Sequence, residues 1–274
     1  MPSALPSLRL GIAGLGAIGT AIARTVDAGG VPGIALAAIA TRDRAKAQRT
    51  TASFKSRPAI VELGALAEAS DIVVECLPSA LFAGIARSAV ERGRIFMPLS
   101  VGKLIDHMDL VDRARQTGAR ILVPTGALLG LDAVRATAEG CIESVKIVTR
   151  KPPGGLAGAP LLVERGISVE GLRQPLLVFE GSAREAIAGF PANVNVAVAL
   201  SLAGIGPDRT RCEIWADPGV TRNTHTIIVK SDSSDLEMTI ANIPSEENPR
   251  TGKITALSVL AALRRLTEPL VVGS

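Results

Sequence analysis

The sequence predicts an α/β protein in which a doubly wound parallel sheet is followed by a second, α+β domain. Three observations predict this class. In the first half, short continuous apolar runs alternate with stretches of helical length. A glycine turn, Gly14 to Gly19, directly follows the first apolar run. After residue 124 the pattern changes to glycine- and proline-rich joints and to strands that alternate between apolar and polar residues.

The composition is that of a folded, mainly aliphatic protein. Of the 274 residues 47% are apolar and 20% charged, which allows a large core and excludes a disordered chain. Aromatic residues make up 2%, and the net charge of +4 comes from scattered basic residues, so the sequence argues against a nucleic-acid partner. The start lacks a charged leader and no run of 18 apolar residues occurs, so we expect neither a signal peptide nor a membrane span.

The three cysteines, Cys76, Cys141 and Cys212, are odd in number and far apart. This usage is typical of a cytoplasmic protein and predicts neither disulfides nor a metal site. We expect each thiol to be buried as a small apolar group.

The first predicted domain covers residues 1–124. Continuous apolar strands separated by helices indicate a parallel sheet that is covered on both faces. The strands are expected at Leu8–Ala13, Ile34–Ala40, Asp71–Leu77, Arg94–Leu99 and Arg120–Val123, and the helices at Ala17–Ala28, Asp43–Phe54, Ala80–Arg92 and Ile105–Thr117.

The second predicted domain covers residues 125–246 and is richer in strands. In Thr224–Val229 the side chains of His225, Ile227 and Val229 share one face, which predicts an open sheet with one solvated face. A last helix within residues 247–274 is expected to pack back on the first domain. The other elements expected here are strands at Ser144–Thr149, Arg211–Ala216 and Leu236–Ala241, and helices at Asn193–Ala203 and Lys253–Thr267.

The glycine turn carries the strongest chemical signal. Gly14 makes the tight turn, Gly16 lets backbone approach a pyrophosphate, and Gly19 lets helix and strand pack closely. The helix that starts at Ala17 and Ile18 presents free amides and a positive dipole end to an anion. The context of strand, turn and helix predicts a Rossmann-type site for NAD or NADP, with these five residues in contact with the cofactor.

The end of the second strand, where an acid often holds the ribose of NAD, reads Thr41-Arg42-Asp43. Arg42 there can meet the 2′-phosphate of NADP. The alternative is that Asp43 caps the next helix and Arg42 is solvated, so the choice between the two cofactors stays open.

Several segments of the second half resemble the L-aspartate dehydrogenase family. They are Phe190 to Ala197 (FPANVNVA), Trp215 to Pro218 (WADP) with Asn223-Thr224-His225, and Asn242 to Thr251 (NIPSEENPRT). Ser100-Val101-Gly102 and Gly126 to Asp132 (GALLGLD) also resemble this family, so the likeness runs through nearly the whole chain.

The resemblance implies a reversible, NAD(P)-dependent oxidation of L-aspartate to iminoaspartate, which hydrolyses to oxaloacetate and ammonia or enters nicotinamide nucleotide synthesis. It also implies that His225 is the acid/base and that Ala127 and Asn195 contact the cofactor. The fold it implies is a Rossmann domain with an α/β substrate domain, assembled as a homodimer or a larger homo-oligomer.

The residue types suit these roles. An imidazole exchanges protons near neutral pH, so His225 is a suitable acid/base, whereas His107 is expected at the surface. Asn193 or Asn195 can hold a carboxamide or simply cap a helix. Lys103 and Arg222 are candidate partners for the substrate carboxylates, although either can be solvated instead.

Two other functions fit parts of the pattern. One is a related reductase of the dihydrodipicolinate reductase or homoserine dehydrogenase kind, acting on another small dicarboxylate or semialdehyde. The other is a catalytically silent NAD(P)-binding sensor. The Asn223-Thr224-His225 segment argues against both.

Overall fold

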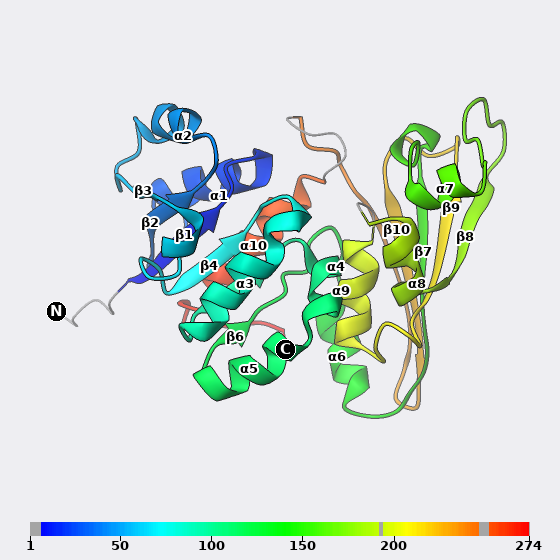
Figure 1. Ribbon diagram of the computed structural model, residues 1–274. Helices are drawn as coiled ribbons and strands as arrows, with labels where there is room; N and C mark the ends of the chain where they lie inside the picture. Colours follow the sequence, from blue (N-terminus) through cyan, green and yellow to red (C-terminus); the bar gives the residue numbers. More distant parts are fainter. Residues whose placement is uncertain (1–6, 192–193, 247–251, 274) are drawn as a thin grey trace. The chain divides into compact units, whose positions relative to one another are not determined.

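The computed structural model describes residues 7–191, 194–246 and 252–273. The chain divides into two compact units (Figure 1). The first comprises Met1–Pro124 with Ala256–Val271, and the second comprises Thr125–Thr255 with Val272–Ser274.

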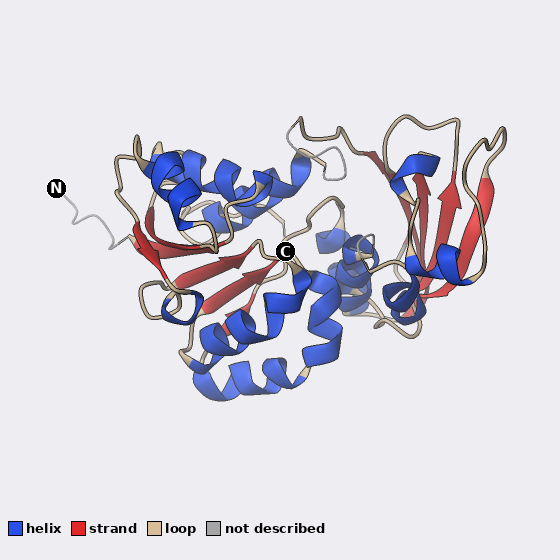
Figure 2. Ribbon diagram, turned by 45° about the horizontal axis from the view of Figure 1, so that its top comes forward, coloured by secondary structure: helices blue, strands red, loops and turns tan. Residues whose placement is uncertain are grey.

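A six-stranded parallel sheet forms the centre of the first unit, in the order β3-β2-β1-β4-β5-β6. Figure 2 shows helices on both of its faces, as the apolar strands predict. The strands are β1 (Leu8–Ala13), β2 (Ile34–Ala40), β3 (Ala59–Val61), β4 (Ile72–Glu75), β5 (Ile95–Pro98) and β6 (Arg120–Ile121). The helices are α1 (Ala17–Asp27), α2 (Arg44–Thr51), α3 (Phe82–Glu91), α4 (Val101–Leu104), α5 (Asp109–Thr117) and α10 (Ile254–Arg264).

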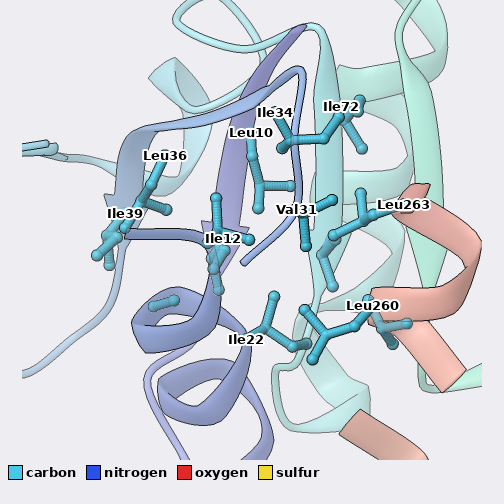
Figure 3. Packing of buried hydrophobic residues seen from close by; sticks show 14 of the residues in the cluster. Leu10, Ile12, Ile22, Val31, Ile34, Leu36, Ile39, Ile72, Leu260 and Leu263 are labelled. Atoms are coloured by element: carbon cyan, nitrogen blue, oxygen red, sulfur yellow. The ribbon is translucent and has the colours of Figure 1, made fainter. Parts of the chain in front are cut away.

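The core of this unit joins the start of the chain to its end. Ile22 of α1 and Leu10 of β1 are fully buried, and Leu260 and Leu263 of α10 pack into the same cluster (Figure 3). Just after α10, the Thr267 hydroxyl donates to the carbonyl of Pro32 over 2.7 Å. The last helix therefore belongs to the core of the first unit, although the second unit precedes it in sequence.

A mixed five-stranded sheet forms the second unit, in the order β11-β10-β7-β9-β8. β10 is antiparallel to both of its neighbours, whereas β7 and β9 are parallel. The strands are β7 (Ile142–Lys151), β8 (Leu176–Ser182), β9 (Arg211–Ala216), β10 (Thr224–Ser231) and β11 (Asp235–Ala241). The helices are α6 (Leu131–Ala138), α7 (Pro160–Glu164), α8 (Ala183–Gly189) and α9 (Asn195–Ala203).

The two faces of this sheet differ in burial. Along β10, His225, Ile227 and Val229 are buried, and the residues between them are half-buried. Figure 1 places α6 and α9 beside one face of β10 and β7. The alternation expected from the sequence is present, and it sets His225 among the buried side chains.

The structure also bears on the expectations for the cysteines, for metal ligands and for membrane-spanning helices. Cys212 is buried, but Cys76 is only half-buried and Cys141 is exposed at the start of β7, so burial of all three thiols was wrong. No group of metal-ligating side chains occurs within residues 7–191, 194–246 and 252–273. None of the helices in those ranges has the length and apolarity that a membrane crossing needs.

Candidate active site

The glycine turn has the geometry that a pyrophosphate site needs. Gly14 has a φ of +99°, and a Cβ added there would lie 2.5 Å from the carbonyl oxygen of Cys76. A Cβ at Gly19 would lie 2.0 Å from the carbonyl oxygen of Gly14, whereas a Cβ at Gly16 would meet nothing within 4 Å. Gly14 and Gly19 are therefore required by the fold, and Gly16 leaves open space beside the start of α1.

The first turn of α1 faces this open space with its amides. The first intrahelical bond runs from the Thr20 amide to the Gly16 carbonyl. The amides of Ala17, Ile18 and Gly19 precede it, so the helix provides them with no acceptor. These residues fit the diphosphate of a dinucleotide.

Beside this turn, the buried carboxylate of Glu75 joins two loops of the first unit. Glu75 ends β4 and is fully buried. Its oxygens accept hydrogen bonds from the Leu77 amide at 2.8 Å and from the Ser100 amide at 2.9 Å. Burial raises the pKa of the Glu75 carboxyl, although these amides favour its charged form. Glu75 fixes the loops after β4 and β5, and an acid within an apolar strand is the signal that the sequence analysis passed over.

The corner after β2 tests the two interpretations of Arg42 and Asp43. The Asp43 carboxylate accepts from the Lys46 amide at 2.8 Å and so caps α2. Arg44 forms an ion pair with Glu62. Arg42 is exposed. Asp43 therefore caps the helix, as one of the two interpretations expected. Its carboxylate is used in that contact.

His225 is held by a hydrogen bond in the second unit. Its Nδ1 lies 3.0 Å from the Thr149 Oγ1, and the two residues are direct partners across β10 and β7. His225 is 3% exposed. Burial, together with the charge of Lys151, lowers the pKa of His225 to about 3. The ring is therefore neutral near pH 7 and fixed in orientation.

A cavity of about 470 Å³ lies within the second unit. Its wall includes Lys151, Asn223 and Asn242, which stand at the end of β7, just before β10 and just after β11. Because β10 runs antiparallel to β7 and β11, the end of β7, the start of β10 and the end of β11 lie side by side at one end of these strands. Arg222 and the glycine-rich segment after Lys151 also line the cavity. His225 does not line it, but follows Asn223 by two residues.

Lys151 is a buried residue of the cavity wall to which the sequence analysis gave no role. It is 6% exposed, and burial lowers its pKa to about 8. The alternation of β7 gives the missing signal, because Val145, Ile147, Thr149 and Lys151 are the buried positions of that strand. A lysine at such a position is rare unless its charge is paired.

Asn242 links the cavity to the loop that contains Ala127. Its Nδ2 donates to the Ala127 carbonyl over 3.0 Å, which fixes the orientation of the amide. Its Oδ1 is buried and has no hydrogen-bond partner within the described part of the chain. The wall of the cavity thus contains an acceptor that a donor on a ligand can satisfy.

The loop that precedes His225 is held by a half-buried ion pair. Arg150 lies over the Trp215 ring, with its guanidinium carbon 4.9 Å from the ring centroid, and donates to the Asp217 carboxylate over 2.9 Å. The second oxygen of Asp217 accepts from the Gly219 amide. These contacts fix the turn that leads to Arg222.

The other predicted residues are placed as follows. Asn195 is the first residue of α9, after the N-cap Val194, so it does not occupy the capping position itself. Asn193 lies outside the described residues. Lys103, on α4 of the first unit, forms an ion pair with Asp106 and does not line the cavity. His107 is half-buried and stacks on Phe82, so it was only partly a surface residue.

The fold of the first unit and its glycine turn define a Rossmann-type NAD(P)-binding protein. Residues 14–124 match the family model "Homoserine dehydrogenase, NAD binding domain", and residues 132–266 match "Aspartate dehydrogenase, C-terminal". The L-aspartate dehydrogenase of Bradyrhizobium diazoefficiens is 56% identical over 272 residues, which are 99% of this chain and 96% of that protein. The chain belongs to the L-aspartate dehydrogenase family.

Other similar proteins agree. L-aspartate dehydrogenase 3 of Bordetella bronchiseptica is 53% identical, with 99% of this chain and all of that protein covered. The crystal structure of aspartate dehydrogenase from Thermotoga maritima has a TM-score of 0.73 at 24% identity and covers 97% of this chain and 99% of that one. The predictions of the family, of the fold class and of NAD or NADP as cofactor are confirmed.

Proposed function

We propose that the protein catalyses the reversible, NAD(P)-dependent oxidation of L-aspartate to iminoaspartate, which hydrolyses to oxaloacetate and ammonia. The observation that carries this proposal is the buried, hydrogen-bonded pair of His225 and Thr149, which stand two residues along their strands from the cavity residues Asn223 and Lys151. Arg222 lines the same cavity. The pair supplies a group for proton transfer, and the cavity supplies cations for a dicarboxylate.

His225 acts as the acid/base, and the negative charge of a bound dicarboxylate raises its pKa from about 3 toward the range in which the ring can hold a proton. In the oxidative direction the neutral imidazole accepts a proton from the substrate ammonium, so that the nitrogen lone pair can form the C=N bond. NAD(P), which the Gly14–Gly19 turn would hold by its diphosphate, would supply the acceptor for the hydride that leaves Cα. In the reverse direction His225 returns the proton to the amine.

Thr149 suits a reaction that runs in both directions. A threonine hydroxyl both donates and accepts. When it accepts from Nδ1, Nε2 of His225 carries the lone pair and is a base. After Nε2 has taken up the substrate proton, the imidazolium still donates from Nδ1 to the hydroxyl, and Nε2 is the acid of the reverse direction. Thr149 is therefore a positioning residue that keeps Nε2 of His225 as the site of proton transfer.

The substrate carboxylates need cationic partners. Arg222 lines the cavity and is exposed, so it can reach an entering anion. We keep Asn193, two residues after the cavity residue Pro191 in sequence, as a substrate-binding candidate. The ion pair of Lys103 with Asp106 counts against Lys103 in this role.

The cofactor-binding residues that we propose are Gly14, Gly16, Ala17, Ile18 and Gly19 at the diphosphate. The open space at Gly16 and the amides of the first turn of α1 support this assignment.

Three further residues are proposed at the cofactor. Arg42 is placed at the ribose, since Asp43 is engaged by α2 and an exposed arginine suits a 2′-phosphate. Ala127 and Asn195 are placed at the cofactor on the family pattern alone.

We also propose that the enzyme is a cytoplasmic homodimer or larger homo-oligomer with no nucleic-acid or membrane partner. The three cysteines are free thiols, which suits a reducing compartment. Half-buried side chains such as Ile228 and Trp215 occupy the more exposed face of the second sheet, where a second copy can cover them.

The test is an assay of NAD(P)H consumption with oxaloacetate and ammonia, beside pyruvate, 2-oxoglutarate and aspartate semialdehyde. We expect consumption that requires ammonia and prefers oxaloacetate. Turnover of another compound in preference to oxaloacetate, or none with any of them despite tight NAD(P)H binding, contradicts the proposal.

A further inference from the structure

Lys151 occupies a position that an apolar residue fills more easily. It ends the buried series of β7 and is 6% exposed. Burying an ammonium costs free energy unless the charge is paired or hydrogen-bonded. Its pKa of about 8 keeps it mostly protonated near pH 7. The cavity wall therefore contains a cation that is largely shielded from solvent.

The position of Lys151 relative to His225 follows from the strand register. His225 pairs directly with Thr149, and Lys151 stands two residues beyond Thr149 on the same face of β7. Lys151 also acts electrostatically on His225. A carboxylate held by Lys151 thus lies on the same face of the sheet as the acid/base, near the residue opposite it on β7.

The rest of the cavity is built for an anion with a second charge. Arg222 supplies another cation. In the segment that follows Lys151, a Cβ added to Gly154, Gly155 or Gly158 would meet nothing within 4 Å, so a ligand can approach that backbone closely. The Oδ1 of Asn242, which has no hydrogen-bond partner among the residues that the structure describes, supplies an acceptor for an ammonium group. Two cations and one acceptor match two carboxylates and one amine.

We propose that Lys151 is a substrate-binding and specificity-determining residue whose buried ammonium holds one carboxylate of the dicarboxylate substrate, while Arg222 holds the other. This inference rests on the proposed function and deepens it. Lys151 contributes the contact made deeper in the protein, because it is buried and Arg222 is exposed. Loss of Lys151 therefore removes preference for two carboxylates over one.

Binding of a non-reacting dicarboxylate tests the proposal without turnover. Succinate and butyrate share a four-carbon chain but carry two carboxylates and one. Calorimetric titration into the full-length protein with NADP⁺ is expected to give tighter binding of succinate by the wild type. Lys151→Met is expected to weaken succinate binding by about 30-fold, as for loss of one charge-assisted hydrogen bond, and to affect butyrate less.

Two further variants complete the design. Lys151→Arg keeps the charge, so its affinity for succinate is expected to fall by less than about 5-fold, less than for loss of the whole charge-assisted hydrogen bond. Lys230→Met removes an exposed lysine from the far part of β10 and is expected to bind succinate as the wild type does. NADPH binding and circular dichroism check that each variant is folded, and Lys151→Gln replaces Lys151→Met if the latter does not fold.

The outcomes separate the two proposals. Equal succinate affinity of the wild type and Lys151→Met, or no succinate binding by the wild type, overturns the role of Lys151. Absence of oxaloacetate reduction by the wild type overturns the proposed function, yet selective loss of succinate in Lys151→Met still supports a dicarboxylate contact. If both proposals hold, Lys151→Met also raises KM for oxaloacetate and leaves NADPH affinity unchanged.

Discussion

Thr149 and His225 lie directly opposite each other on β7 and β10, and their side chains meet in a 3.0 Å hydrogen bond between Oγ1 and Nδ1. They are 76 residues apart in sequence. Antiparallel pairing brings their Cβ atoms together on the buried face of the sheet. The backbone therefore fixes the imidazole, and the hydroxyl selects which ring nitrogen is available.

Replacing Thr149 by Val removes this hydroxyl while keeping a side chain of similar shape. The Nδ1 of His225 then lacks its partner in a buried site. We expect kcat to fall by about tenfold, the value of one hydrogen bond, with NADPH affinity unchanged. Thr149→Ser keeps the hydroxyl and is expected to restore most of the activity. Steady-state kinetics with equal rates for Thr149→Val and the wild type are incompatible with a positioning role.

Replacing His225 by Ala removes the acid/base itself. Turnover is expected to fall by about 10²-fold or more, the usual range for general acid–base catalysis. NADPH affinity is expected to change little, because the glycine turn belongs to the other unit. Because His225→Ala leaves a cavity where a buried ring stood, His225→Asn serves as a second variant that leaves a smaller one. Turnover near the wild-type value in either variant removes His225 from the mechanism.

The glycine turn offers a matched pair of substitutions. Gly16→Val places its side chain in open space, so the protein is expected to fold and to lose NAD(P)H affinity by crowding the diphosphate. Gly19→Ala places a methyl group 2.0 Å from the Gly14 carbonyl oxygen and is expected to lower stability instead. Fluorescence titration and thermal melting separate the two effects. Normal NAD(P)H affinity in Gly16→Val contradicts the assignment of the glycine turn to the cofactor diphosphate.

Arg42 and Arg44 form a second pair. Arg42→Ala is expected to weaken the binding of NADPH by about tenfold or more, as for loss of one charged contact to a phosphate. The affinity for NADH is expected to stay nearly unchanged. Arg44→Ala breaks an exposed ion pair with Glu62 and is expected to change neither cofactor selectively. If Arg42→Ala weakens NADH and NADPH equally, Arg42 does not recognise the 2′-phosphate.

The local parts of the fold were open to prediction, and the contacts between distant strands were not. The bounds of β1, β2 and β9 agree with expectation because continuous apolar or alternating runs determine them. β3 was missed because it has three residues, and β8 because Leu176–Ser182 has no clear alternation.

The candidate site divides in the same way. The glycine turn is local in sequence, and His225 stands on a regular strand, so both were predicted. Lys151 and Asn242 were given no role because their neighbours come from distant segments. Asn242 contacts Ala127 across 115 residues.

Lys151 also determines how stability depends on pH. A pKa lowered from 10.5 to about 8 means that the folded protein disfavours the charged lysine by about 3 kcal/mol. Between pH 8 and 10.5 the unfolded chain binds more protons at Lys151 than the folded one, so this residue makes stability rise with pH in that window. Lys151→Met removes both effects. We expect the variant to unfold with a free energy larger by about 3 kcal/mol at pH 7 and to lose this advantage toward pH 10.5. Urea unfolding at pH 7, 9 and 10.5 measures the difference, and a constant difference across that range contradicts a buried, charged Lys151.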